Sequence, residues 1–156
     1  MANKEHHLIM ARELETVETG LAMLYTLYAE RLTAYQDFWK DLAAAERTHA
    51  LMMQTLQELI EKNQIIYGER KFSLRAIQYN SEVIRAQIVF TERNPVAIRE
   101  ALHEAMQFEN LLIEKNLFEI QDGDSEQLKQ TLASLLYDTR IHLVRVTQLY
   151  NQLGHP

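Results

Sequence analysis

The sequence predicts an all-α protein built as a four-helix bundle, and three observations support this prediction. The 156 residues include only four Gly and two Pro, so few positions interrupt regular structure. Apolar residues recur every three or four positions over four long stretches. The first and third breaks between these stretches are short and the second is long, as in two helical hairpins joined by a long crossover. We therefore expect one domain over residues 1–156, with the crossover at about 64–94.

The first hairpin is predicted from two amphipathic stretches. The first helix runs from His7 to about Arg31, and a short polar joint follows at 33–36. Asp37 is the predicted N-cap of the second helix, which ends near Lys62 with a basic residue at the expected end. The apolar positions of the first helix, spaced by one helical turn, are Leu14, Val17, Leu21, Leu24, Tyr25, Tyr28 and Leu32.

The crossover and the third helix follow. Residues 64–93 have a less regular apolar pattern, and we expect this connection to be helical only around Ser73 to Arg85. Asn94 and Pro95 then predict a helix start, with Asn as the N-cap and Pro at the first helical position. This third helix is expected to end at about Ile120.

The fourth helix follows the clearest turn in the chain. Residues 122–125 read Asp-Gly-Asp-Ser, a sequence typical of turns. The helix is expected from about Ser125 to Leu153, and Gly154 closes it.

Composition excludes several classes of function. The formal charge is 16 − 22 = −6, which offers no basic surface for nucleic acid. The absence of cysteine excludes disulfides, thiolate metal sites and Cys nucleophiles. No apolar run is long enough for a signal peptide or a membrane span. We therefore expect a soluble cytoplasmic protein with neither nucleic-acid nor membrane partners.

Charged and imidazole side chains interrupt the apolar faces of all four predicted helices. A buried charge without a partner costs several kcal/mol or shifts its pKa until it is neutral. Three carboxylates and two imidazoles that point inward therefore predict a common partner, and metal ions satisfy both types of ligand. The candidate ligands are Glu18, Glu46, His49, Glu109 and His142.

The pattern repeats within the chain. The first and third helices align at an offset of 109 − 18 = 91, which matches Glu18 with Glu109. The second and fourth align at 142 − 49 = 93, which matches His49 with His142. Two similar halves, each with a Glu followed by a histidine-bearing helix, predict a pseudo-twofold site between them.

These motifs resemble a known family. Glu18-x-x-Leu21-x-x-x-Tyr25-x-x-x-Ala29, followed by Leu42-x-x-x-Glu46-Arg47-Thr48-His49, resembles the first half of rubrerythrin and its relatives in the ferritin-like superfamily. Ala101-Leu102-x-x-Ala105-Met106-x-x-Glu109 is similar to the opening of their third helix. The resemblance covers about 140 residues with the crossover included. The C-terminal rubredoxin domain that rubrerythrins usually carry needs four cysteines, and this sequence has none.

The resemblance implies a ferritin-like four-helix bundle with a carboxylate-bridged di-iron centre, although Mn or Zn would suit the same ligands. Such a centre reduces peroxide or reacts with dioxygen, here with electrons from an external donor. In that arrangement Glu18 and Glu109 are terminal or bridging ligands, Glu46 bridges, and His49 and His142 each cap one iron.

One position departs from the family pattern. The second Glu-x-x-His falls on Thr139 and His142, because 46 + 93 = 139. Asp138 is a sixth candidate ligand if a π-bulge in the fourth helix brings it inward; without one, it faces a neighbouring helix or solvent. Glu114 is a further candidate for compensation, although its spacing of five residues from Glu109 places it off the same face. A full di-iron centre with an unusual ligand, a mononuclear or weakened site, and a relic without metal all remain open.

Alternative functions follow from the same sequence. A degenerate bundle would serve as an interaction or scaffold protein, as a homodimer that uses the apolar crossover residues Ile84, Ile88, Val89 and Phe90. Iron storage is a third option and requires a cage of many subunits. Tyr25 either donates a hydrogen bond to a ligand carboxylate or fills the core.

Overall fold

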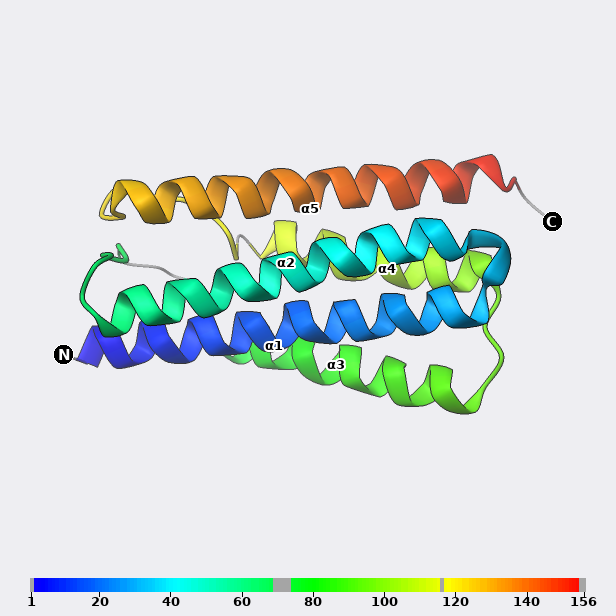
Figure 1. The fold of residues 1–156 in the computed structure, drawn as a ribbon, viewed down its shortest axis with the longest axis horizontal. Helices are drawn as coiled ribbons and strands as arrows, with labels where there is room; N and C mark the ends of the chain where they lie inside the picture. The colour runs from blue at the N-terminus through cyan, green and yellow to red at the C-terminus, as the bar shows by residue number, and fades with distance from the viewer. Residues whose placement is uncertain (1, 69–73, 116, 155–156) are drawn as a thin grey trace.

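The protein is all-α, as predicted. A computed structural model describes residues 2–68, 74–115 and 117–154. Within these residues it contains no strand, and its helices run nearly along one long axis (Figure 1). The five α-helices are α1 (Ala2–Arg31), α2 (Gln36–Glu61), α3 (Leu74–Arg93), α4 (Ile98–Glu114) and α5 (Glu126–Gln152), and a short 3₁₀ helix, η1 (Thr33–Tyr35), joins α1 to α2.

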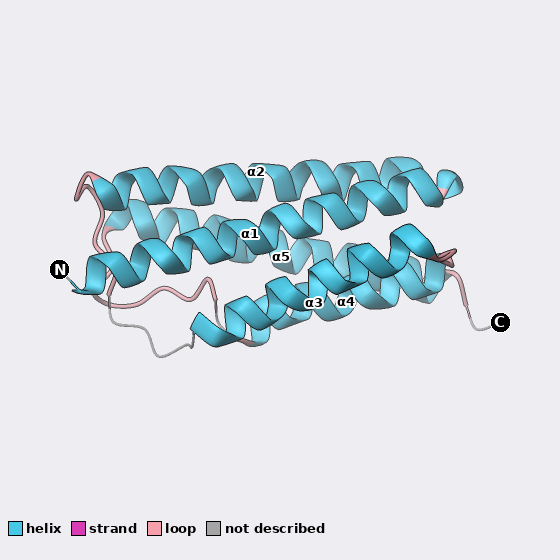
Figure 2. Ribbon diagram, turned by 90° about the horizontal axis from the view of Figure 1, so that it is seen from below, coloured by secondary structure: helices cyan, strands magenta, loops and turns pink. Residues whose placement is uncertain are grey.

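Two helical hairpins make up most of the molecule. α1 packs along α2, and α4 packs along α5. α3 packs mainly against α1, which lies between α2 and α3 in Figure 2. The colour gradient of Figure 1 shows that α3 carries the chain back along the length of the bundle. The long crossover is therefore a helix that returns the chain to the end where α2 began, so that α4 starts there.

The crossover helix is longer than the sequence pattern indicated. It extends to Arg93 rather than Arg85, and Ser73 lies outside the described residues. It lies close to α1 at Gly20, where a Cβ atom would stand 2.9 Å from Ile84 Cγ2. Glycine thus fits a helix interior here because another helix packs closely against it. Ile84 is buried by this contact, whereas Val89 and Phe90 are exposed.

Two predicted helix starts were wrong. α2 begins at Gln36 without a side-chain cap, because the η1 turn supplies the carbonyl of Thr33 to the Gln36 N–H instead of Asp37 capping the helix. α4 begins at Ile98 rather than Pro95. The Asn94 side chain donates a hydrogen bond to Phe90 O at 2.9 Å and so completes the last turn of α3.

Two further helix ends flank the loop before α5. α4 stops at Glu114 rather than Ile120, and the buried side chains of Leu117 and Phe118 continue the core from an irregular segment. α5 begins directly after Ser125, as predicted, although the Ser125 side chain makes no capping hydrogen bond.

The predicted turn at 122–125 fastens the loop before α5 to the start of the crossover. Asp124 Oδ1 accepts a hydrogen bond from the Gly68 N–H at 2.7 Å, and its Oδ2 accepts one from the Gln121 N–H at 2.8 Å. A Cβ atom on Gly123 would stand 2.9 Å from Gly68 Cα, so the two backbones meet where only glycine fits.

The core is aromatic on one side of the polar residues. Trp39 is fully buried, and its ring lies 5.4 Å from that of Tyr25 and 4.9 Å from that of Tyr28.

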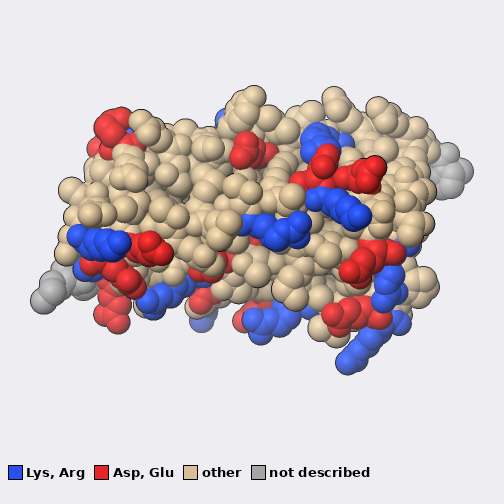
Figure 3. Space-filling model, viewed as in Figure 1, with Lys and Arg blue, Asp and Glu red and all other residues tan. Residues whose placement is uncertain are grey.

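On the face drawn in Figure 3, acidic and basic side chains lie beside one another rather than in a patch of one sign. In the described part of the chain, no helix combines the length and apolar character needed to cross a bilayer.

Candidate metal centre

The structure brings all five candidate ligands of the core faces together. α1 contributes Glu18, α2 contributes Glu46 and His49, α4 contributes Glu109, and α5 contributes His142. Each is at most 4% exposed. The helix-by-helix alignment of the two halves therefore predicted which side chains meet, because residues matched at equal depth on antiparallel hairpins converge on the same level of the core.

These five residues form two overlapping triads of metal-ligating atoms. One triad is Glu18, Glu46 and His49, and the other is Glu46, Glu109 and His142. Within each triad the ligating atoms all lie within 4.8 Å of one another. Glu46 belongs to both, so the cluster can hold two cations that share one carboxylate.

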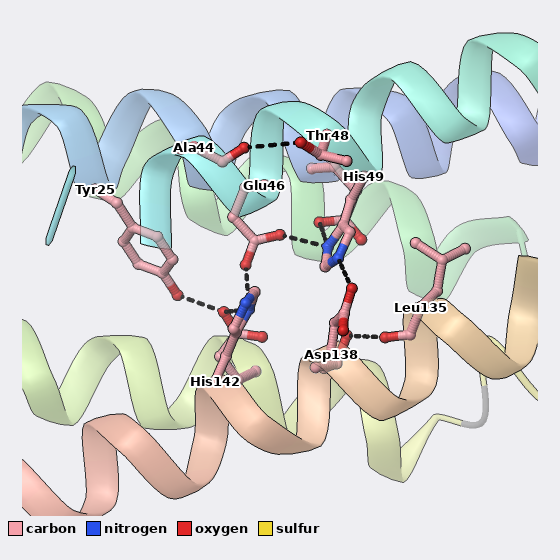
Figure 4. A network of polar contacts seen from close by, with 11 residues as sticks. Tyr25, Ala44, Glu46, Thr48, His49, Leu135, Asp138 and His142 are labelled. Carbon is pink, nitrogen blue, oxygen red and sulfur yellow. Dashed lines mark hydrogen bonds and ion pairs between the residues drawn. The ribbon is translucent and has the colours of Figure 1, made fainter. Parts of the chain in front are cut away.

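The two oxygens of Glu46 face different histidines. Its Oε2 lies 3.0 Å from His49 Nδ1, and its Oε1 lies 2.9 Å from His142 Nδ1 (Figure 4). The two imidazole rings are stacked, with centroids 5.5 Å apart. In the absence of a metal, the histidines donate to this central carboxylate through the same nitrogens that would bind a cation.

The outer carboxylates are not satisfied by the protein. Neither oxygen of Glu18 and only one of Glu109 has a hydrogen-bond partner among the described residues. Glu18 Oε2 is 3.7 Å from His49 Nδ1, and Glu109 Oε1 is 3.6 Å from His142 Nδ1, beyond hydrogen-bond distance. A buried group without a partner costs about 1–3 kcal/mol, and more if it is charged. Buried carboxylate and imidazole donors with open oxygens fit a pair of cations.

Electrostatics within the cluster favour bound protons when no metal is present. Burial raises the pKa of Glu46 well above its usual range, and the nearby charges of Glu109 and Glu18 raise it further. Burial alone would lower the pKa of His49, but the nearby carboxylates of Glu18 and Glu46 outweigh it and raise the pKa to about 11. The carboxylates therefore hold a positive charge between them even without a metal.

Tyr25 supports the cluster from α1. Its hydroxyl donates a hydrogen bond to Glu109 Oε1 at 2.8 Å, and the side chain is fully buried, so it both orients a carboxylate and fills the core. Burial raises the Tyr25 pKa well above its usual range, and the charges of Glu109 and Glu46 add to this. Tyr25 is therefore a neutral donor over the physiological pH range.

Asp138 contacts the cluster from outside both triads. Its Oδ2 lies 3.0 Å from His49 Nε2, the nitrogen that faces away from Glu46, and its side chain is 42% exposed. No π-bulge brings Asp138 inward, because α5 is α-helical throughout Glu126–Gln152. No bulge is needed, since the His49 ring extends far enough toward α5 to meet a side chain at the edge of its inward face.

The two remaining positions contribute no carboxylate to the cluster. Thr139 is buried, and its hydroxyl donates to Leu135 O at 2.7 Å within α5. Glu114 is exposed and accepts a hydrogen bond from Asn110 Nδ2 at 2.8 Å. Glu114 therefore lies off the cluster face, as its spacing indicated, because a residue five positions after Glu109 is rotated by about 140° around the helix.

Comparison with known proteins does not place this chain in a family. The chain matches no protein-family model, no curated protein and no solved structure. The buried cluster is therefore the feature from which a function can be inferred.

Proposed function

We propose that this chain is a rubrerythrin-like protein of the ferritin-like class that binds two metal ions, iron in its working form, at the centre of its bundle. The observation that carries this proposal is the sharing of Glu46 between two buried Glu/His triads. A simple structural network would have no need for the three carboxylate oxygens of Glu18 and Glu109 that lack hydrogen-bond partners within the described part of the chain.

The proposed division of ligands follows the triads. Glu18, Glu46 and His49 would hold one ion, and Glu46, Glu109 and His142 would hold the other. The ions would replace the positive charge that His49 holds in the metal-free protein.

The two triads would hold the iron pair, which would supply two electrons to an oxidant when bound as ferrous ions, and we propose peroxide or dioxygen as that oxidant. The protein keeps its ligands buried, so bulk water does not compete for the site. Tyr25 holds Glu109 in place and offers a neutral O–H donor beside it. Because the sequence contains no cysteine for an iron–sulfur or rubredoxin-type centre, we propose that a separate donor provides the electrons.

Asp138 orients His49 in this proposal and is not a sixth ligand. A carboxylate that accepts the second N–H of a ligating histidine fixes its tautomer and raises its basicity. The 3.0 Å contact to His49 Nε2 leaves Nδ1 directed at Glu46 and Glu18, which is the arrangement this role requires.

The test is elemental analysis of protein purified without chelators or an affinity tag, with an anaerobic ferrous titration of the metal-free form. Near two metals per chain support the proposal. Glu46→Ala and Glu109→Ala are expected to lower the metal content with the helical fold retained. Glu114→Ala is the matched control, because this exposed carboxylate lies on the same helix as Glu109. Unchanged metal content in both cluster variants would contradict the proposal.

A second candidate is a metal-free scaffold, and the position of Thr139 favours it. Thr139 stands where a second Glu-x-x-His would have its Glu, and its hydroxyl donates a hydrogen bond to Leu135 O of the same helix. Each oxygen of Glu46 already has a histidine partner. Exposed Val89 and Phe90 on α3 would then serve contact with a second copy. A melting temperature that does not change when Fe(II), Mn(II) or Zn(II) is added would favour the scaffold.

A further inference from the structure

We propose that the metal-loaded centre takes up one small monocarboxylate anion, such as formate or acetate, at the place on α5 where Thr139 stands. This inference rests on the proposed function, because it concerns the site with both metal ions bound. It identifies a ligand that the protein itself does not supply.

Charge balance is the first argument. The two triads contain three carboxylates, from Glu18, Glu46 and Glu109, and two histidines that are neutral when they bind metal. Three negative charges against the four positive charges of two divalent ions leave one positive charge in a fully buried site. An uncompensated buried charge is costly, so a single exogenous anion stabilises the loaded site. Asp138 does not supply this charge within the site, because it is half-exposed and contacts the outer nitrogen of His49.

The position of Thr139 is the second argument. It precedes His142 by three residues, so the two side chains lie on the same face of α5, and it is only 1% exposed. The internal repeat matches it with Glu46, the carboxylate shared by both triads. A threonine here provides a methyl and a hydroxyl, and the hydroxyl is engaged with Leu135 O. The position related to the bridging carboxylate therefore lacks one, and a free carboxylate has the same ligand chemistry.

Access to this side of the site is the third argument. Asp138, the neighbour of Thr139, is 42% exposed and also contacts His49 in the cluster. A side chain that contacts a cluster ligand therefore reaches solvent on the α5 side, at the position next to Thr139.

The experiment uses the full chain loaded with Co(II), whose visible absorption reports its ligands, and titrates it with formate and with acetate. We expect a saturable spectral change and a higher melting temperature in the wild type, and no such change in metal-free protein. Thr139→Glu supplies its own carboxylate, so it should bind the second Co(II) more tightly than the wild type and no longer respond to the anions. Thr139→Ser, which keeps the hydroxyl, is the matched control and should respond like the wild type.

Several results would overturn the inference. If wild type with two Co(II) ions shows no anion response, or if Thr139→Glu responds equally, the vacant position is not an anion site, while the metal centre stands. If the chain binds no Co(II) at all, the proposed function fails and this inference fails with it. Should Thr139→Glu not fold, Thr139→Gln fills the same space without charge and is expected to block the anion response.

Discussion

Glu18 is the least satisfied carboxylate of the cluster. It is fully buried, and neither of its carboxylate oxygens has a hydrogen-bond partner among the described residues. Replacing a poorly paired buried charge with an apolar residue of similar size often stabilises a protein, by about 1–4 kcal/mol. We expect Glu18→Leu to raise the melting temperature of the metal-free protein and to weaken metal binding.

Calorimetry of the metal-free variant and a metal titration check both effects. Glu15→Leu is the control on the same helix, because Glu15 is bound by Gln54 and Gln57 and lies outside the cluster. A Glu18→Leu protein that is less stable and binds metal normally would make Glu18 an ordinary core residue.

The raised pKa values of His49 and Glu46 predict how pH acts on the centre. The pKa of His49 is raised from 6.5 to about 11, so the folded metal-free protein binds more protons than the unfolded chain in that window. The raised pKa of Glu46 acts in the same direction. The stability of the metal-free protein should therefore fall as pH rises above 6.5, whereas metal affinity should rise because binding displaces protons.

Melting temperatures of the metal-free and metal-loaded forms from pH 6 to 9 test this opposition, and titrations in two buffers of different ionisation enthalpy measure the protons released. We expect release of about one to two protons per chain at neutral pH. Metal affinity that is independent of pH would show that the cluster binds metal without losing protons.

Asp138 tests the difference between a ligand and an orienting residue. If it only orients His49, Asp138→Asn should weaken metal binding about 10–100-fold and leave the number of ions per chain unchanged. Loss of one ion per chain would instead identify it as a ligand. Asp41→Asn is a suitable control, because Asp41 pairs with Arg145 at 3.5 Å and belongs to neither triad.

The residue scale also shows how far the sequence could predict the site. Glu18, Glu109 and the Glu46–His49 pair could be identified because each interrupts a run of apolar residues with helical spacing. The partner of Asp138 could not be identified from the sequence, because the contact depends on which nitrogen of His49 turns toward α5. Periodicity defines faces of a helix and says nothing about the rotamer of a side chain on the facing helix.

At the scale of helices and loops, the turn before α5 is the most constrained connection. Gly123 meets Gly68 backbone to backbone, and a Cβ atom would approach Gly68 Cα to 2.9 Å. Because the backbone cannot move aside cheaply, we expect Gly123→Ala to cost about 1–3 kcal/mol of unfolding free energy. Denaturant unfolding measures this, and Asp122→Ala, at the exposed neighbouring position, should have little effect. Equal stability of both variants would mean that the loop tolerates separation from the crossover.

Helix existence could be predicted more reliably than helix boundaries. α1, α2 and α5 follow directly from amphipathic periodicity. Asn94 and Pro95 marked a boundary correctly but were assigned to the wrong helix, because the Asn94 side chain serves the end of α3 through Phe90 O. An Asn side chain can accept from a following helix or donate to a preceding one, and only the path of the chain decides between them.

At the scale of the whole molecule, polar contacts of the centre join the two hairpins. Glu46 from the first hairpin reaches His142 of the second, and Tyr25 reaches Glu109 in the same way. The triads predict an unequal response to mutation: Glu18→Leu and Glu109→Leu should each retain about one ion per chain, because each residue belongs to one triad. Glu46→Leu should retain none, because it belongs to both.

The same pattern should appear in stability, because a ligand that binds only the folded state stabilises it by an amount set by its concentration relative to Kd, about 4 kcal/mol at a thousandfold excess. Melting temperatures with and without Co(II) should therefore shift most in the wild type, less in Glu18→Leu and Glu109→Leu, and not at all in Glu46→Leu. Metal-free melting temperatures serve as the baseline for each variant, since the substitutions change the stability of the bundle itself. If all three variants have equal metal content and equal shifts in melting temperature, Glu46 is not a ligand shared by both ions. In that case the shared carboxylate does not couple metal binding to the two hairpins.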